Sequence, residues 1–488
     1  MSQKPNNVLY ILSDEHSKRV LGAMGNPVIQ TPNLDRLAEA GTTFESAYAN
    51  CPICVPSRAS LATGRNVHQI GNWDNAFPYT GEPRGWAHRL VEAGHRCDSI
   101  GKLHFRSTDD ANGFSREILP LHVLEGRGDL QGMLRNPPVA RPSTAQLARD
   151  AGEGDSSYLG YDRKIRDAAI AWLKERASAP DDKPWCAFVS FVCPHFPLIA
   201  PPEFFRLYPL DQVPLPQLRG PDELPDHPVV RQMRQVQNYE DHFRNEEQVR
   251  TAIAAYYGMV SFLDDNIGQI LGALEEAGLA DSTTVLYTSD HGDNLGARQM
   301  WGKSTMYEES AGVPMILKGP GVPAGKRVQT PVSLVDSYQT IVEGVGLALD
   351  ERERAELPGS SLLELAHGAD HDRTVLSEYH AVASITGTFM IRFGRYKYVH
   401  FEGYPPQLFD LENDPLECQD LAGDDGHAAV RAEGDRRLRA ICDPTAVNAR
   451  AFADQARRIE AFGGVEAVKR SGNYPYTPVP GEAARITY

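Results

Sequence analysis

Residues 51–65, Cys51-Pro-Ile-Cys54-Val-Pro-Ser-Arg58-Ala-Ser-Leu-Ala-Thr-Gly64-Arg65, contain the motif from which the fold and the function of this chain are inferred. The residues after Cys54 are typical of a helix start, and Gly64 lies near the expected helix end. A cysteine at a helix N-terminus sits in positive potential, which favours a thiolate or another anion. The alternative is that Cys54 is a small buried hydrophobic residue, and the extended string around it argues against that alternative.

The chain has 488 residues, of which 41% are hydrophobic and 23% are charged, as in an ordinary globular protein. This length suits one large domain with a smaller one. The formal net charge of −16 argues against nucleic acid as a partner, because no basic stripe is available to displace counterions. An anionic substrate must therefore be drawn in by a local group of cations.

The chain has seven cysteines, which is an odd number, and their spacing does not repeat. They therefore do not indicate a disulfide scaffold. Residues 1–7 lead directly into an apolar run, with no secretory h-region and no cleavage site. No stretch approaches the roughly 18 apolar residues that are needed to span a bilayer. We therefore expect a soluble cytoplasmic protein without a membrane partner.

Two carboxylates and an imidazole follow expected buried strands. The apolar run 8–12 ends just before Asp14, and the run 283–288 ends just before Asp290 and His291. Ligands of open α/β sheets gather at the carboxyl ends of the strands, so these side chains and Cys54 together predict a divalent-cation site. Oxygen-rich ligands favour Ca²⁺, Mg²⁺ or Mn²⁺ over zinc. Each aspartate alone would more often be a turn or helix-cap residue.

A second set of candidates is cationic. Single lysines and arginines are most often solvated surface charges, but these fall inside the motif or near the ends of apolar strands, where full exposure is not expected. Together with a metal they would hold a tetrahedral anion and offset the charge that gathers on a leaving oxygen. The set consists of Arg58, Lys102 and Lys303, with His104 and His195 beside them.

Strands and helices alternate up to about residue 350, which predicts a doubly wound α/β sheet. Short strands at 388–393, 396–401 and 407–411 then predict a small antiparallel sheet. We expect three parts: an α/β catalytic domain over 1–375, a small sheet with a helix over 376–442, and a C-terminal tail over 443–488.

The extended cysteine motif, combined with Asp14 and Asp290-His291, resembles the type I sulfatases of the alkaline phosphatase superfamily over residues 5 to about 420. The resemblance implies a large mixed, mostly parallel sheet flanked by helices. It also implies that a formylglycine-generating enzyme oxidises Cys54 to formylglycine, which works as its hydrate. The metal, Ca²⁺ first and Mn²⁺ or Mg²⁺ otherwise, would be held by Asp14, Asp290, His291 and the modified Cys54.

The resemblance further implies a role for each remaining candidate. Arg58 would stabilise the hydrate, and Lys102 with Asn75 would bind sulfate oxygens. His195 and Lys303 resemble the substrate-binding pair that protonates or neutralises the leaving alkoxide. His104 resembles the base that takes a proton from the second hydrate oxygen, so that sulfate leaves and the aldehyde returns.

Two positions depart from the common family pattern. Many sulfatases have two consecutive aspartates after the first strand, whereas this chain has Asp14-Glu15. His291 likewise replaces an asparagine found in many members. We therefore expect the coordination shell of the branch that uses a histidine, and we leave Glu15 out of the expected ligand set.

Two further features indicate which branch of the superfamily this chain resembles. Phosphonate monoester hydrolases share the cysteine motif but have tyrosine and threonine where this chain has Lys102 and His104, so the sequence favours sulfate monoesters. The tail segments Gln455-Ala-Arg-Arg458 and Ser471-Gly-Asn-Tyr-Pro-Tyr476 resemble the C-terminal extension of choline sulfatases, which reaches a neighbouring subunit and implies a homo-oligomer. The alternative for the tail is a disordered terminus.

The choice of alcohol stays open. Residues 119–157 have little periodicity and predict an irregular insertion that shapes a pocket. A quaternary ammonium such as choline is usually held by an aromatic cage. The insertion contains no Trp, Phe or Tyr, although Trp73, Phe77 and Tyr79 lie near Asn75. An aryl sulfate, an alkyl sulfate and a sulfated sugar all remain possible.

The leading interpretation is a formylglycine-dependent sulfatase that hydrolyses an alkyl or aryl sulfate monoester to an alcohol and sulfate. One alternative is a phosphonate monoester or phosphodiester hydrolase built on the same site. An alternative from another class is a catalytically silent, sulfatase-like binding or scaffold protein in which Cys54 stays unmodified.

Overall fold

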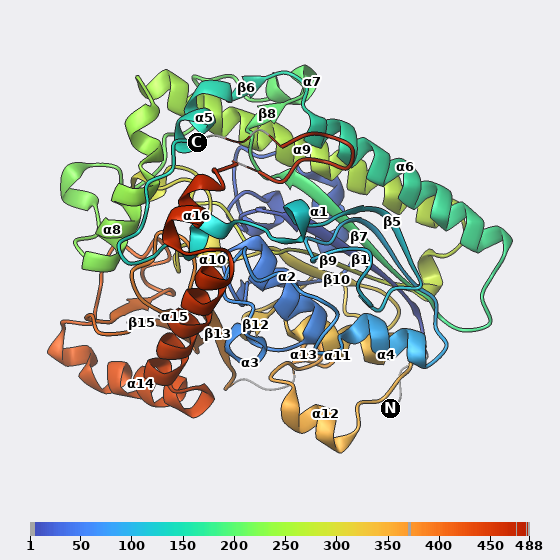
Figure 1. Ribbon diagram of the computed structural model, residues 1–488. Coiled ribbons are helices and arrows are strands. Elements are labelled where there is room, and N and C mark those ends of the chain that lie inside the picture. The colour runs from blue at the N-terminus through green and yellow to red at the C-terminus, as the bar shows by residue number, and fades with distance from the viewer. Residues whose placement is uncertain (1–4, 369–371, 475, 485, 487–488) are drawn as a thin grey trace.

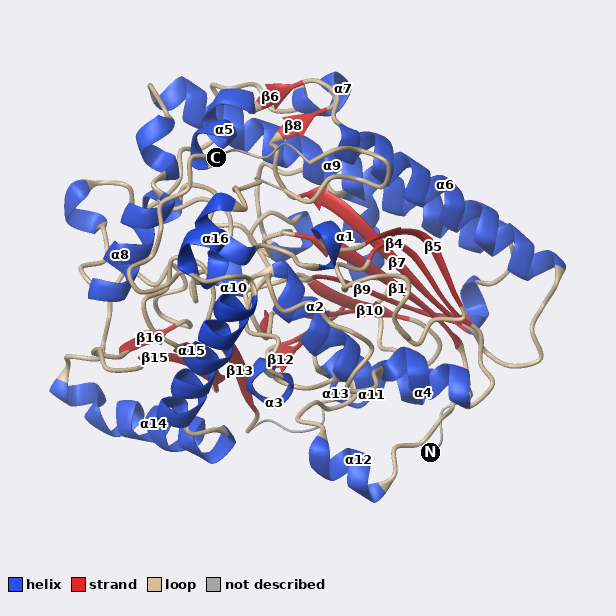
Figure 2. Cartoon of the chain, viewed as in Figure 1, coloured by secondary structure: helices blue, strands red, loops and turns tan. Residues whose placement is uncertain are grey.

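The computed structural model describes residues 5–368, 372–474, 476–484 and 486. Its centre is an eight-stranded sheet with helices on both faces, and a smaller sheet lies toward one end (Figures 1 and 2). Strand β10 is antiparallel to both of its neighbours, whereas the other neighbouring pairs of the large sheet are parallel. In spatial order the strands are β11 (Lys326–Val328), β2 (Thr42–Phe44), β10 (Met315–Lys318), β9 (Thr283–Ser289), β1 (Asn7–Asp14), β7 (Cys186–Pro194), β4 (Cys97–Lys102) and β5 (Arg116–Leu121).

Strand β1 shows why the central strands are continuous apolar runs. Leu9 and Ile11 belong to the hydrophobic core on one face of the sheet, whereas Tyr10 and Leu12 belong to the core on the other face. Successive side chains of a strand point to opposite faces, so a strand covered on both sides needs apolar residues at every position. The expectation of a mixed, mostly parallel sheet flanked by helices is confirmed.

Helices cover the two faces separately (Figure 1). Helices α1 (Pro32–Glu39), α6 (Ser157–Ser178) and α9 (Glu246–Glu276) contribute to the core on one face. The other core includes side chains of α2 (Cys54–Thr63), α4 (Trp86–Glu92), α11 (Asp336–Gly344) and α13 (Leu362–Leu365). None of the described helices combines the length and the apolar character needed to cross a bilayer.

The predicted C-terminal antiparallel sheet is present and has one more strand than expected. Its strands follow one another as a meander: β13 (Thr374–Tyr379), β14 (Thr388–Phe393), β15 (Tyr396–Phe401) and β16 (Gln407–Asp410). Helix α14 (Ala428–Ile441) packs on β14 and β15, and α15 (Pro444–Ala461) and α16 (Val465–Arg470) follow. The division of the chain at residues 375 and 442 stays a prediction.

Shorter elements complete the chain. These are β3 (Ala47–Tyr48), α3 (Val67–Ile70), α5 (Thr144–Asp150), β6 (Gly152–Glu153), β8 (Ile199–Ala200), α7 (Pro202–Phe205), α8 (Pro228–Gln237), α10 (Glu308–Ala311), β12 (Val332–Ser333) and α12 (Glu351–Glu356).

Two expectations about irregular segments are wrong in part. The insertion 119–157 contains helix α5, whose Leu147 and Ala148 are buried, so its one turn of apolar spacing was too short to recognise. The alternative of a disordered tail does not hold for two described residues of the final segment, because Asn473 and Thr477 are buried. Their burial depends on the neighbours they meet, because polar residues carry no hydrophobic pattern.

A buried ion-pair group joins the C-terminal sheet to helix α10. The Lys397 ammonium on β15 lies 2.8 Å from Oε1 of Glu417 and 2.6 Å from Oε1 of Glu308 on α10, and it donates to the Met306 carbonyl oxygen at 2.9 Å. Lys397 and the side chain of Glu417 are fully buried. Removing one partner of such a group leaves buried charge uncompensated.

We expect Lys397→Met to lower the free energy of unfolding by about 3–5 kcal/mol, because Glu417 loses its cation and Glu308 keeps only its ion pair with Lys18. Urea unfolding followed by circular dichroism measures this. The double variant Lys397→Met/Glu417→Gln should recover part of the loss. A single variant as stable as the wild type would show that the group contributes nothing to stability.

Candidate active site

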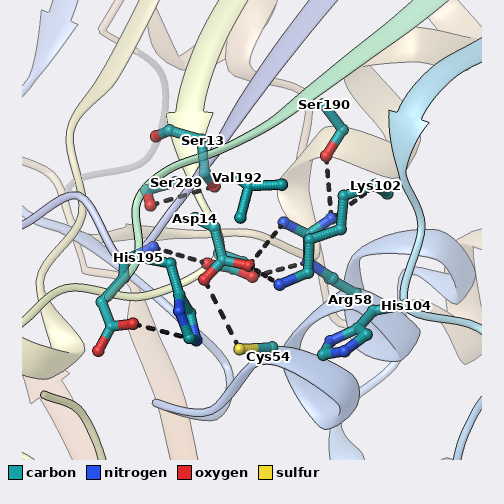
Figure 3. A network of polar contacts seen from close by, with 12 residues as sticks. Ser13, Asp14, Cys54, Arg58, Lys102, His104, Ser190, Val192, His195 and Ser289 are labelled. Carbon is teal, nitrogen blue, oxygen red and sulfur yellow. Dashed lines mark hydrogen bonds and ion pairs between the residues drawn. The ribbon is translucent and has the colours of Figure 1, made fainter. Parts of the chain in front are cut away.

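The carboxyl ends of neighbouring parallel strands bring the candidate residues together (Figure 3). Asp14 ends β1, Lys102 ends β4, and His195 follows the last residue of β7. Asp290 follows β9, and Cys54 is the first residue of α2, which approaches the same edge. Because adjacent parallel strands end side by side, residues far apart in sequence converge on one site.

Four possible metal ligands form one buried cluster. One ligand atom from each of Asp14, Cys54, Asp290 and His291 lies within 4.8 Å of the others. The Cys54 Sγ lies 3.6 Å from Oδ1 of Asp14 and 3.2 Å from Nε2 of His291. Nε2 of His291 lies 3.8 Å from Oδ1 of Asp14 and 3.7 Å from Oδ1 of Asp290. Adjacent oxygens around an ion with ~2.4 Å bonds are about 3.4 Å apart, so these spacings fit a divalent cation.

Hydrogen bonds from neighbouring groups leave the ligand atoms of the cluster available to a cation. The Nδ1 atom of His291 lies 3.0 Å from the Gly292 carbonyl oxygen and donates to it, so Nε2 keeps its lone pair for a metal. The Arg58 Nε donates to Oδ2 of Asp290 at 2.7 Å, and Nη2 lies 3.3 Å from Oδ2 of Asp14. Both carboxylates therefore present their Oδ1 atoms to the cluster.

Asp14 is also held by Lys102, whose ammonium donates to its Oδ2. Burial acts to raise the pKa of Asp14, but Lys102 and the other cations nearby lower it well below its usual range. The carboxylate is therefore charged at neutral pH, which is the form that binds a metal.

The expectation of a Cys54 thiolate is wrong for the unmodified side chain. Burial, together with the negative charge of Asp14, raises the pKa of Cys54 to about 11. The charges of Lys303 and Lys102 act to lower this pKa and do not outweigh these two effects. The thiol is protonated at neutral pH, so unmodified Cys54 is a poor nucleophile.

Lys303 and His195 form a hydrogen-bonded pair next to Cys54. The Nδ1 of His195 lies 2.7 Å from the Phe196 carbonyl oxygen and donates to it, so Nε2 is free to accept from the Lys303 ammonium, 2.7 Å away. The same ammonium lies 3.3 Å from the Cys54 Sγ and 3.0 Å from Oε2 of Glu15.

Electrostatics place the shared proton of this pair on the lysine. Burial and the Lys303 charge lower the pKa of His195 well below its usual range. Burial acts to lower the pKa of Lys303, but the nearby carboxylates of Glu15 and Asp14 act against it, and the pKa is raised well above its usual range. A neutral imidazole and an ammonium therefore stand beside Cys54.

His104 lies across Cys54 from His195 (Figure 3). Its backbone φ of 59° is in the left-handed region, which is uncommon for a non-glycine residue and occurs often at functional sites. Burial and the charges of Lys102 and Arg58 lower the pKa of His104 well below its usual range, so the imidazole is neutral. Asn75 accepts a hydrogen bond from the Val55 N–H at 3.1 Å and thereby caps the start of α2.

A cavity opens above Cys54, and Asn75, Lys102, His104, His195 and Lys303 line it. Its wall is rich in aromatic side chains. The insertion 119–157, which was expected to shape the pocket, contains no Trp, Phe or Tyr, so the sequence did not predict an aromatic wall. The expected aromatics Trp73 and Tyr79 are buried elsewhere and do not line the cavity. The aromatic residues that do line it are Tyr158, Phe196, Tyr239, Trp301, Tyr474 and Tyr476.

Three contributors to the site were missed by sequence reasoning. Ser190 accepts a hydrogen bond from Nη1 of Arg58 at 2.9 Å, and its place in the apolar strand β7 could have signalled this. Glu15 contacts Lys303, and it follows Asp14 directly. Thr477 contacts His104 at 2.9 Å, and nothing in its local sequence indicates this.

Comparisons with known proteins agree with this geometry. The Sulfatase family profile matches residues 6–347, and a profile described as N-sulphoglucosamine sulphohydrolase, C-terminal, matches residues 296–443. A choline-sulfatase of Rhizobium meliloti (strain 1021) is 31% identical over 99% of this chain and 95% of its own length. Arylsulfatase K of Danio rerio is 32% identical over 91% of this chain and 84% of its own length.

Solved structures show the same fold. The phosphonate monoester hydrolase of Agrobacterium radiobacter superimposes with a TM-score of 0.71 at 25% identity, covering 92% of this chain and 96% of that one. BT1596, a 2-O GAG sulfatase, superimposes with a TM-score of 0.69 at 25% identity, covering 91% and 96%. One explanation accounts for the motif around Cys54, the strand-end ligands, the profile match over residues 6–347 and the relatives that match nearly the whole chain. The chain belongs to the type I sulfatases of the alkaline phosphatase superfamily.

Proposed function

We propose that the protein hydrolyses a sulfate monoester of an alkyl or aryl alcohol to the alcohol and sulfate. The observation that carries this proposal is the placement of Cys54 between a buried metal-ligand cluster and the Lys303–His195 pair, at the floor of a cavity. A tetrahedral anion over Cys54 would meet positive charge from Lys102 and Lys303 and a carboxylate-bound cation below.

Two groups implied by the family complete the proposed site. Asp14, Asp290, His291 and the residue-54 side chain would hold a divalent cation, for which we propose Ca²⁺, with Mn²⁺ and Mg²⁺ as the ions to compare. When bound, the cation acts as a Lewis acid that stabilises negative charge on oxygen. Formylglycine derived from Cys54 by the formylglycine-generating enzyme would supply a nucleophilic hydroxyl in place of a protonated thiol.

The chain's own residues divide the remaining work. Arg58 holds the two metal-binding carboxylates in place and neutralises part of their charge. Lys102 and Asn75 bind sulfate oxygens. The ammonium of Lys303, poised on Nε2 of His195, supplies the proton or the positive charge that the departing alcohol oxygen needs. His104, a neutral imidazole, accepts a proton from the residue-54 hydroxyl.

Substrate preference tests this proposal against the alternative of a phosphonate or phosphodiester hydrolase. kcat/KM is measured for 4-nitrophenyl sulfate, for a phenylphosphonate monoester and for a panel of alkyl sulfates that includes choline sulfate, because a relative carries that name. We expect sulfate esters to be preferred. A clear preference for the phosphonate would overturn the roles of Lys102 and His104.

The silent-protein alternative is tested on residue 54 directly. Peptide mass spectrometry across residues 51–65, after expression in a host with the oxidising enzyme, should show formylglycine at position 54. An unmodified thiol would favour a binding or scaffold protein. Self-association and a cytoplasmic location stay predictions, and light scattering of the purified protein tests the first.

Metal binding is expected to stabilise the fold. Adding Ca²⁺ at a hundredfold excess over its Kd should raise the free energy of unfolding by about 2.7 kcal/mol, because the ion binds only the folded cluster. Thermal melts with and without a chelator measure this. Asp290→Asn should abolish the calcium-dependent shift, whereas Asp265→Asn, an exchange on α9 outside the ligand cluster, should retain it. An Asp290→Asn variant with an unchanged shift would exclude this cluster as the site.

A further inference from the structure

The described part of the C-terminal tail lies against the active site of its own chain. Tyr474, Tyr476 and Thr477 line the cavity above Cys54. The Tyr158 hydroxyl on α6 donates to the Thr477 carbonyl oxygen at 2.7 Å, and the Tyr158 and Tyr476 rings meet edge to face with centroids 5.0 Å apart. Thr477 is therefore held by both its backbone and its neighbours, and its side chain has a defined direction.

That side chain meets the imidazole of His104. The Thr477 Oγ1 lies 2.9 Å from Nε2 of His104, and both residues are buried. The other ring nitrogen, Nδ1, is buried and has no hydrogen-bond partner among the residues that the structure describes. The His104 N–H donates to the Leu121 carbonyl oxygen on β5 at 2.8 Å, which fixes the backbone but not the orientation of the ring. The tail supplies the hydrogen bond to the ring.

We propose that Thr477 is a positioning residue that selects the tautomer of His104. Its hydroxyl accepts a hydrogen bond from Nε2–H, so the lone pair of His104 is on Nδ1. This inference rests on the proposed function, in which His104 accepts a proton. It adds to that function a residue from the last dozen positions of the chain.

The hydrogen bonds available to His104 favour the Nε2-protonated tautomer over the Nδ1-protonated one. With the proton on Nδ1, a buried N–H donor would have no acceptor among the described residues, which is destabilising because the donor has also lost its hydrogen bond to water. With the proton on Nε2, the donor is paired with Thr477, and the unpaired atom is an acceptor that a hydroxyl on residue 54 can satisfy. Orphaned buried N–H groups are rarer than under-satisfied acceptors.

The same arrangement suits the proton transfer. A proton that leaves the residue-54 hydroxyl binds the Nδ1 lone pair, and the oxygen keeps the electron pair of the broken O–H bond. The ring then carries a proton on each nitrogen and one positive charge. Thr477 accepts from Nε2–H before and after this step, so its hydroxyl need not rotate.

The first test measures the tautomer without formylglycine or substrate. Protein with unmodified Cys54 is labelled with ¹⁵N-histidine, and the His104 signals are assigned with a His104→Gln variant. We expect Nε2-protonated His104 in the wild type and in Thr477→Ser, which keeps the hydroxyl. In Thr477→Val we expect loss of this preference. An unchanged tautomer in Thr477→Val would overturn the proposal, whether or not the protein is a sulfatase.

The second test is kinetic. We expect Thr477→Val to lower steady-state kcat by about 10- to 100-fold, with KM changed less than about twofold. This loss in kcat is smaller than the loss expected when a general base itself is removed. The first turnover should still release alcohol at the wild-type rate, because His104 acts after the alcohol departs. Thr477→Ser should restore turnover. Equal losses in Val and Ser variants, or an equally slowed first turnover, would indicate a merely structural role.

Two further variants separate these effects from loss of fold. Thr251→Val removes a hydroxyl that only bonds the Glu247 carbonyl of its own helix, and it should leave the tautomer and kcat unchanged. Tyr158→Phe removes the donor to the Thr477 backbone and should shift the tautomer in the same direction as Thr477→Val. Thermal melts show whether each variant is folded. A folded Tyr158→Phe protein with the wild-type tautomer would count against the tail as the element that holds His104.

Discussion

Replacing Cys54 with alanine is expected to abolish sulfatase turnover, by more than about 10⁴-fold, while the protein stays folded. The variant lacks the side chain that becomes the nucleophile and supplies one of the four cluster ligands. The loss of one buried sulfur atom leaves only a small cavity, which costs about 1–2 kcal/mol. Initial rates on an aryl sulfate and thermal melts measure the two effects.

Cys51→Ala is the matched control for this variant. Cys51 is equally buried and lies three residues earlier, but it is not one of the four clustered ligands. It should lose a similar amount of stability and keep its activity. A Cys54→Ala protein with near-native rates would refute the assigned nucleophile, and with it the proposed function.

Replacing His195 with alanine is expected to slow alkyl sulfates by about 10²- to 10⁴-fold and to slow an aryl sulfate with a good leaving group less than about tenfold. Alkoxides are strong bases and need a proton as they depart, whereas nitrophenolate does not. His195 accepts a hydrogen bond from the Lys303 ammonium at 2.7 Å, so its loss leaves the lysine paired with Glu15 and without an imidazole. Lys303→Met should show the same dependence on the leaving group.

A series of sulfate esters whose alcohols differ in pKa measures this effect, as the slope of log kcat/KM against the leaving-group pKa. The slope should be steeper in His195→Ala than in the wild type. His400→Ala, on strand β15 of the small sheet, should leave the slope unchanged. Equal losses on alkyl and aryl esters would exclude His195 as part of the proton donor.

Periodic patterns predicted the elements that carry the site. The run 8–12 lies inside β1 and the run 283–288 inside β9, because strands buried on both faces are apolar at every position. Helix α9 is another element with a strong pattern, since its apolar residues recur at helical spacing over many turns. Short elements such as α5 were not predicted, because one or two helical turns contain too few apolar residues to show a periodic pattern.

The candidate site followed from sequence where its residues adjoin such elements. Asp14 and Asp290 were expected to meet because each follows a central strand, and their ligand atoms do lie in one cluster. The charge state of Cys54 did not follow. The helix start alone favours a thiolate, but full burial and the carboxylate of Asp14 decide otherwise.

From the order of its residues, this chain could be assigned a sheet class, the cysteine motif of the sulfatases and a pair of strand-end carboxylates. The wall of the cavity could not be inferred, because Tyr158, Trp301 and Tyr476 come from separate segments that meet only in the folded chain. Nor could the hydrogen bond between His104 and Thr477, which are 373 positions apart. Backbone geometry imposes a regular spacing on apolar residues within an element, whereas contacts between distant side chains depend on how all the elements pack and leave no periodic trace.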